Sequence, residues 1–191
     1  KTIELYKENN DCSSENYADD LNNLAIVYDD VRAADKAAEL YKEAAEIKSG
    51  LLGENSESYI ETIENLGALY SITGSFDKAE ELLKKVNEAY RDICGTLSPK
   101  YVKSLYNLGN MYTDRGKFAE AGEYLDKALE HAKKLRDFDV ADMEDIRVSI
   151  GRLCKKSGNY KRALDEYERA VKISEEREEE PSYFKMSFLL A

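Results

Sequence analysis

The chain is poor in several residue types that many functions require. Its 191 residues include no tryptophan, one histidine, two prolines and three cysteines. The few prolines, together with ten glycines, leave little room for linkers between domains. Three cysteines are an odd number without metal-ligand or disulfide spacing, which is typical of a reducing compartment. We therefore expect a cytoplasmic protein.

Long apolar runs and excess positive charge are also missing. No apolar stretch approaches the roughly 20 residues that a membrane-spanning helix requires. The formal net charge is −11, which would repel phosphates and anionic lipid head groups. We therefore expect neither nucleic acid nor a membrane as the main partner.

What the chain does contain is a repeat of 42 residues. Residue types return at this interval in five series: Leu24, Leu66, Leu108 and Ile150; Ala25, Gly67, Gly109 and Gly151; Tyr28, Tyr70, Tyr112 and Cys154; Ala37, Ala79, Ala121 and Ala163; Gly74, Gly116 and Gly158. Such a period is typical of a solenoid, in which each unit buries its apolar face against its neighbours. Function is then expected on the surface of the stacked units.

Each repeat is predicted to fold as two helices. Apolar residues three and four positions apart, such as Ile63, Leu66 and Tyr70, form one helical stripe. The pattern predicts first helices at about 17–31, 56–73, 98–115 and 140–157, and second helices at about 33–51, 76–94, 118–136 and 160–177. We expect the small residues of the first helices, such as Gly67, to face the alanines of the second, such as Ala79.

The connections carry recognisable stop and start signals. Gly74, Gly116 and Gly158 follow the first helices, where a left-handed residue ends a helix at low cost. Arg32 stands at this place in the first repeat, so we expect a turn of different construction there. Ser56 and Ser98 are expected to cap the helices that follow them, and residues 137–139 to do so without a glycine.

The motif Leu66-Gly67-x-x-Tyr70-x-x-x-Gly74-x-Phe76-x-x-Ala79 returns from Leu108 to Ala121 and resembles the tetratricopeptide repeat. Its 42-residue period is similar to the longer variety found in kinesin light chains. The resemblance covers about residues 17–177 and implies an all-α fold, a right-handed α-solenoid of antiparallel helix pairs.

The same pattern predicts how the chain is divided. Four helix pairs are expected at about 17–55, 56–97, 98–139 and 140–180. Residues 1–16 are expected to be the tail of a preceding repeat, and 181–191 the start of a further or capping helix. The chain is therefore expected to be a segment of a longer protein.

The resemblance implies a non-catalytic scaffold that binds a peptide or helical segment of another protein. In this family the first helices line a concave groove, and the residue before each marker leucine points into it. The predicted peptide-binding residues are Asn23, Asn65, Tyr106, Asn107, Asn110, Arg152 and Lys156. An asparagine amide can pair with both the N–H and the C=O of a peptide. The alternative is that these amides only bond neighbouring helices.

Charge differs between the predicted first helices. Acidic side chains such as Asp19 and Glu64 project from the early ones, and Arg147, Arg152 and Lys156 from the last. If these side chains line one groove, it is acidic at one end and basic at the other.

We expect no enzyme. The only histidine, His131, stands alone on a predicted second helix, and no histidine is placed to activate Cys94. A glycine-rich phosphate loop and metal-ligand spacings are missing from the sequence, so no cofactor is expected.

Two other functions remain open at this point. The chain could be a sensor or regulatory segment of a larger bacterial protein, in which the repeats bind a neighbouring domain until a signal peptide displaces it. It could also be a self-assembly module whose solenoid ends associate through the apolar C-terminal helix, which contains Phe184 and Phe188.

Overall fold

The computed structural model describes residues 13–176 of the chain. All regular structure in that range is α-helical, which confirms the expected all-α fold of helix pairs. The chain divides into two compact units, residues 1–92 and 93–191, and each is described by itself. Across residues 13–176, every helix is too short or too polar to cross a membrane.

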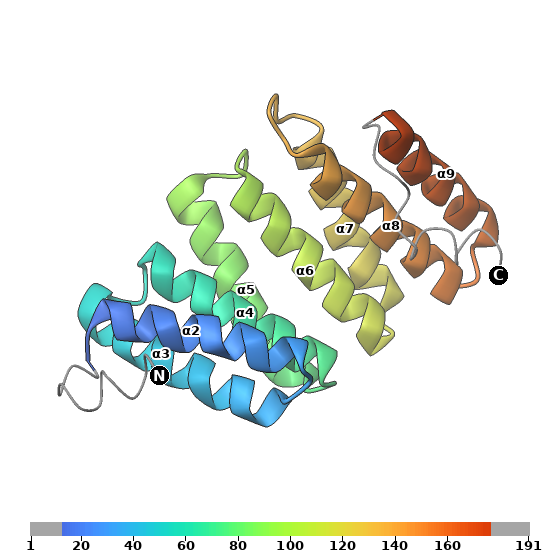
Figure 1. Ribbon diagram of the computed structural model, residues 1–191. Helices are drawn as coiled ribbons and strands as arrows, with labels where there is room; N and C mark the ends of the chain where they lie inside the picture. Colours follow the sequence, from blue (N-terminus) through green and yellow to red (C-terminus); the bar gives the residue numbers. More distant parts are fainter. Residues whose placement is uncertain (1–12, 177–191) are drawn as a thin grey trace. The chain divides into compact units, whose positions relative to one another are not determined.

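The first unit contains two helix pairs. They are α2 (Glu15–Asp30) with α3 (Ala34–Leu52), and α4 (Glu57–Ile72) with α5 (Phe76–Cys94), whose last two residues fall in the second unit. Helix α3 packs against both α2 and α4 (Figure 1). The predicted cap Ser56 is confirmed, since its hydroxyl accepts the backbone N–H of Tyr59.

The second unit has the same construction. It pairs α6 (Pro99–Arg115) with α7 (Phe118–Ala132), and α8 (Val140–Lys156) with α9 (Tyr160–Glu176). Ser98 caps α6, and the Asp139 carboxylate caps α8 by accepting the N–H of Ala141 at 2.7 Å. The observed bounds lie close to the predicted ones, except that α7 ends at Ala132, whereas the prediction extended it to residue 136.

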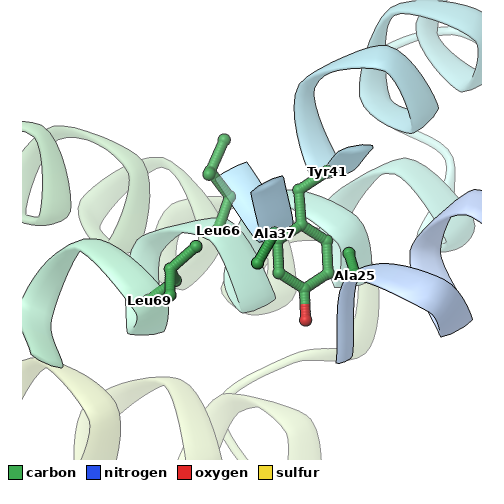
Figure 2. Packing of buried hydrophobic residues seen from close by; sticks show 5 residues of the cluster. All are labelled: Ala25, Ala37, Tyr41, Leu66 and Leu69. Carbon is green, nitrogen blue, oxygen red and sulfur yellow. The ribbon is translucent and has the colours of Figure 1, made fainter. Parts of the chain in front are cut away.

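The core of the first unit lies between α2, α3 and α4. Ala25, Ala37, Tyr41, Leu66 and Leu69 form one buried cluster, and none of them is more than 5% exposed. Figure 2 shows the Tyr41 ring between the two alanines, with the leucines of α4 beside them. Each helix alone would leave these side chains in water, so the helices depend on one another for stability.

The glycines of three first helices lie directly under large side chains of the second helices. A Cβ atom added at Gly67 would lie 3.0 Å from Leu83, one at Gly109 2.5 Å from Leu125, and one at Gly151 2.7 Å from Tyr167. At these three positions the glycine makes room for a large side chain one turn beyond the alanine, since an added Cβ would lie 3.0 Å or less from that side chain. The expected facing of small residues is confirmed for Ala25 and Ala37, which share one buried cluster. For the other three pairs it stays a prediction.

The turn at Arg32 was predicted wrongly. Arg32 has a φ of 60°, in the same left-handed region as Gly74 at 77°. The backbone hydrogen bonds are equivalent too. The Arg32 N–H donates to the Asp29 carbonyl, and the Ala33 N–H donates to the Tyr28 carbonyl. At the corresponding turn, the Gly74 N–H donates to the Ser71 carbonyl and the Ser75 N–H to the Tyr70 carbonyl. The hairpin therefore imposes the glycine conformation on an arginine.

Exchanging the residues at these two turns should move stability in opposite directions. A left-handed conformation costs a residue with a Cβ about 1–2 kcal/mol. We expect Arg32→Gly to raise the free energy of unfolding by about 1 kcal/mol and Gly74→Arg to lower it by a similar amount. Urea denaturation would measure both. Arg32→Ala serves as the control, because it removes the side chain and keeps the strain, and an equal gain there would contradict the explanation.

Tyr41 is a buried phenol whose ionisation the fold disfavours. Burial raises the pKa of Tyr41 to about 12, with a further contribution from the Asp29 and Asp30 carboxylates. Burial also raises the pKa of Asp29, and the neighbouring Asp30 adds to this shift. Because the folded state holds the Tyr41 proton more tightly than the unfolded chain, the resulting stability is complete below pH 10 and is lost as the pH rises toward 12.

Tyr41→Phe should therefore make the protein less sensitive to alkali. Between pH about 9.5 and 11, we expect the wild type to lose about 1 kcal/mol more unfolding free energy than the variant. Denaturant titrations at a series of pH values measure this difference. Tyr160→Phe is the matched control, since Tyr160 is 70% exposed. An identical pH slope in wild type and Tyr41→Phe would contradict the assignment.

Two predictions fall largely outside the described residues. The tail expected at 1–16 has only its last residues in the range, and they include the start of α2 at Glu15. The helix expected at 181–191, with Phe184 and Phe188, lies wholly outside it. The division into four repeats at residues 55, 97 and 139 stays a prediction.

Candidate functional site

Five of the seven predicted binding residues lie in the second unit, on α6 and α8. These two helices are neighbours. The spacing of three and four residues puts one set of side chains on the same side of each helix. We call this surface the α6–α8 face; it comprises Lys103, Tyr106, Asn107, Asn110 and Asp114 of α6, and Asp142, Asp145, Arg152 and Lys156 of α8.

Side chains 42 residues apart meet across this face. Arg152 donates from Nη2 to Asn110 Oδ1 at 2.7 Å and from Nη1 to the two Asp114 carboxylate oxygens at 3.2 and 3.3 Å. Lys156 Nζ donates to Asp114 Oδ1 at 2.7 Å. Asp114 therefore links two predicted site residues, Arg152 and Lys156, and these two cations share one carboxylate.

This cluster is accessible to solvent. The side chains of Arg152, Asp114 and Lys156 are 32%, 35% and 44% exposed. Its formal charge is +1, and the arginine still has donors beyond those it uses. The sequence pointed to Arg152 and Lys156 but left Asp114 out of the predicted site. The shared 42-residue offset is the signal that would have paired it with Lys156.

A pocket lies at the other end of the same face. It has a volume of about 180 Å³ and is lined by Val102, Lys103 and Tyr106 of α6, by Phe138, and by Asp142, Asp145 and Ile146 of α8. Val102 and Ile146 are buried, and the charged side chains are exposed. Tyr106 was a predicted site residue. Asn107 follows it and is half-buried.

The two predicted site residues of the first unit differ in solvent exposure. Asn23 is exposed on α2, and Asn65 is half-buried on α4. The Asn65 amide donates from Nδ2 to Asn22 Oδ1 at 3.4 Å. This is the bond between neighbouring helices that the sequence left open as the alternative to peptide contact. Ligand contact by Asn23 and Asn65 stays a prediction.

Some charges expected on the surface lie inside the hairpins. Arg147 Nη1 pairs with Glu166 Oε2 at 2.8 Å, and these side chains are 13% and 6% exposed. Glu64 is buried and accepts a hydrogen bond from the Tyr90 hydroxyl at 3.3 Å. The expected gradient of surface charge is therefore wrong at Arg147 and Glu64. Their partners lie on the second helices of the hairpins. The residue pattern of a single helix does not reveal such a partner.

The cysteines and the histidine differ in their surroundings, and Cys94 is exposed. The Cys154 thiol is buried, and burial raises its pKa, which disfavours the thiolate. The His131 ring stands edge-on to the Tyr101 ring, with centroids 5.5 Å apart. Among residues 13–176, the histidine, cysteine and acidic side chains form no group suited to a metal ion.

Comparison with known protein families identifies the family of this chain. The model of the tetratricopeptide repeat matches residues 21–92 and 101–176, one stretch in each unit. The chain belongs to the tetratricopeptide repeat family. A comparison with curated proteins found no match.

Solved structures of similar fold support the assignment. BtubC (BKLC) from P. vanneervenii has a TM-score of 0.76 and 24% identity over 87% of this chain and 66% of that one. A putative kinesin light chain of Podosopora anserina with nearly identical TPR-like repeats has a TM-score of 0.73 and 20% identity, over 92% and 83%. A Rap protein complexed with Competence and Sporulation Factor has a TM-score of 0.71 and 18% identity, over 82% and 42%. At these identities the likeness concerns the fold.

The two kinds of arginine on α8 should differ in their effect on stability. Arg152→Ala should cost less than about 1 kcal/mol of unfolding free energy, because its ion pair is solvent-exposed. Arg147→Ala should cost about 3 kcal/mol, because Glu166 is left as a buried charge without its closest partner. Chemical denaturation at neutral pH would measure both. Equal losses of unfolding free energy would show that Arg152 stabilises the fold as much as the buried Arg147 does.

Proposed function

We propose that this chain is a non-catalytic protein-interaction module that holds a peptide or helical segment of a partner on the α6–α8 face. Tetratricopeptide repeats generally mediate protein–protein interaction, and the chain belongs to that family. The observation that carries the proposal is the combination, on one face, of a side-chain-sized pocket with a half-exposed Arg152.

The chemistry of this face suits a polypeptide better than a small metabolite. The pocket has a volume of about 180 Å³, which suits one side chain. Typical small-molecule sites are larger, with volumes of about 300–1,000 Å³. Asn107 and Asn110 offer amide donors and acceptors that match a peptide backbone. Arg152 and Lys156 offer charge-assisted donors to a carboxylate. Their ion pairs with Asp114 are exposed to solvent and therefore weak, so a ligand carboxylate can compete with Asp114 for Arg152.

A second candidate function uses the same face. The Rap protein of similar fold is complexed with Competence and Sporulation Factor. By analogy, the repeats would be a sensor segment of a larger bacterial protein and would bind a neighbouring domain until a signal peptide displaces it. The two functions differ in whether the ligand is tethered to the same polypeptide. Self-assembly through residues 181–191 is a third possibility.

Selection of peptides from a random 12-residue library displayed on phage would test the proposal. We expect enriched sequences, and synthetic copies should bind wild-type protein in a fluorescence anisotropy titration. The double variant Asn107→Ala with Arg152→Ala should raise the Kd at least about tenfold, because it removes two polar contacts to the ligand.

The control is Lys134→Ala. Lys134 lies just beyond the end of α7, and its exposed side chain pairs with Glu130. It should bind as the wild type does, and circular dichroism should show equal helix content in all variants. Equal affinity of the wild type and the double variant would remove the site from the α6–α8 face. Concentration-dependent mass in sedimentation, without peptide binding, would instead favour self-assembly.

A further inference from the structure

The pocket on the α6–α8 face combines an apolar interior with an acidic rim. Val102 and Ile146 are at most 2% exposed and supply its buried apolar wall, with Tyr106 and Phe138 beside them. Asp142 and Asp145 stand three residues apart on α8, so both carboxylates face the same side of that helix. Lys103 is the one lining residue that carries a positive charge, which makes the formal charge of the lining −1.

We propose that this pocket receives an arginine side chain of the bound polypeptide. The proposal rests on the proposed function and names the chemistry of its ligand. A pocket of about 180 Å³ holds one side chain. Of the twenty types, only lysine and arginine combine an apolar stem, suited to Val102 and Ile146, with a cation that can reach the rim.

Arginine fits the lining better than lysine does. Its planar guanidinium stacks on aromatic rings, and Tyr106 and Phe138 provide two. It also presents several donors in a fixed plane, which two carboxylates one helical turn apart can share. A lysine ammonium is a compact, strongly hydrated charge that gains less from the rings. The Lys103 stem is flexible, so its ammonium can turn into water when a second cation enters.

The rest of the face predicts a second feature of the ligand. About ten residues of α8 separate Asp142 and Asp145 from Arg152 and Lys156, which corresponds to about 15 Å along the helix. An extended peptide covers that length with about four or five residues. The cluster at Arg152 carries an excess of one positive charge and would attract a carboxylate. We therefore expect an arginine and an acidic residue, or a terminal carboxylate, separated by about four residues.

The charge order also sets the direction of the bound segment. The acidic rim lies toward the amino ends of α6 and α8, and the basic cluster toward their carboxyl ends. Reversing a ligand with one arginine and one carboxylate would place like charges together, which costs binding free energy and selects one orientation.

The test uses the peptides selected from the random 12-residue library on wild-type protein. We expect most binders to share one arginine and an acidic group about four residues away. In synthetic copies, replacing that arginine by citrulline keeps its shape and removes its charge. This replacement should weaken binding to the wild type about tenfold, and norleucine should weaken it at least as much.

The protein variant Asp142→Asn with Asp145→Asn should abolish the preference for arginine over citrulline. Both residues are exposed, so the variant is expected to keep the fold, which circular dichroism would check. Asp137→Asn, which removes a carboxylate of the same unit outside the pocket lining, is the matched control and should keep the preference.

Each result bears on a different claim. Binders with a leucine or phenylalanine in place of the arginine would overturn the arginine pocket and leave the proposed function intact. An arginine preference that survives in the Asp142 and Asp145 variant would place the arginine elsewhere on the protein. A library without any enriched binder would count against both the pocket and the proposed function.

Discussion

The close approach of two helices in each hairpin is the constraint on which the rest of the structure depends. It requires a small residue on the first helix, because a large side chain of the second lies directly over it. Gly109 under Leu125 and Gly151 under Tyr167 leave no room for a Cβ. Glycine inside a helix costs about 1 kcal/mol relative to alanine. The packing of the large side chain offsets that cost, since burial of a side chain such as leucine contributes about 1.5–3 kcal/mol.

This constraint also organises the surface. Because the hairpins of one unit are built alike, residues 42 apart occupy equivalent places on α6 and α8. Their side chains then lie opposite each other, as Asn110 and Asp114 lie opposite Arg152 and Lys156. The turns cooperate with this geometry. At Arg32 the hairpin keeps its left-handed turn even though the residue is not glycine, so interactions between helices override a local preference of about 1–2 kcal/mol.

Local signals in the sequence predicted the helices, and interactions between helices account for the errors. Ser56, Ser98 and Asp139 cap helices as expected, because a cap depends on the next three residues alone. The turn at Arg32 and the burial of Arg147 depend on the packing of another helix, which the pattern of a single helix does not specify. The candidate site follows the same rule. The positions of Tyr106 and Asn107 could be predicted from helical spacing. The link from Asp114 to Lys156 follows the 42-residue offset, but that from Asp114 to Arg152, 38 residues apart, does not.

The contrast between the two arginine pairs of α8 explains why binding is proposed at one of them. Arg147 is committed to Glu166 inside the hairpin, where separating the pair would leave a buried charge at a cost of about 3–5 kcal/mol. Arg152 shares Asp114 with Lys156 in contact with solvent, and such pairs contribute about 0–1 kcal/mol. A carboxylate of a partner can therefore replace Asp114 at Arg152 with little loss, while Lys156 keeps Asp114 paired. An ion pair that is weak in the free protein is thus well suited to exchange its anion for that of a ligand.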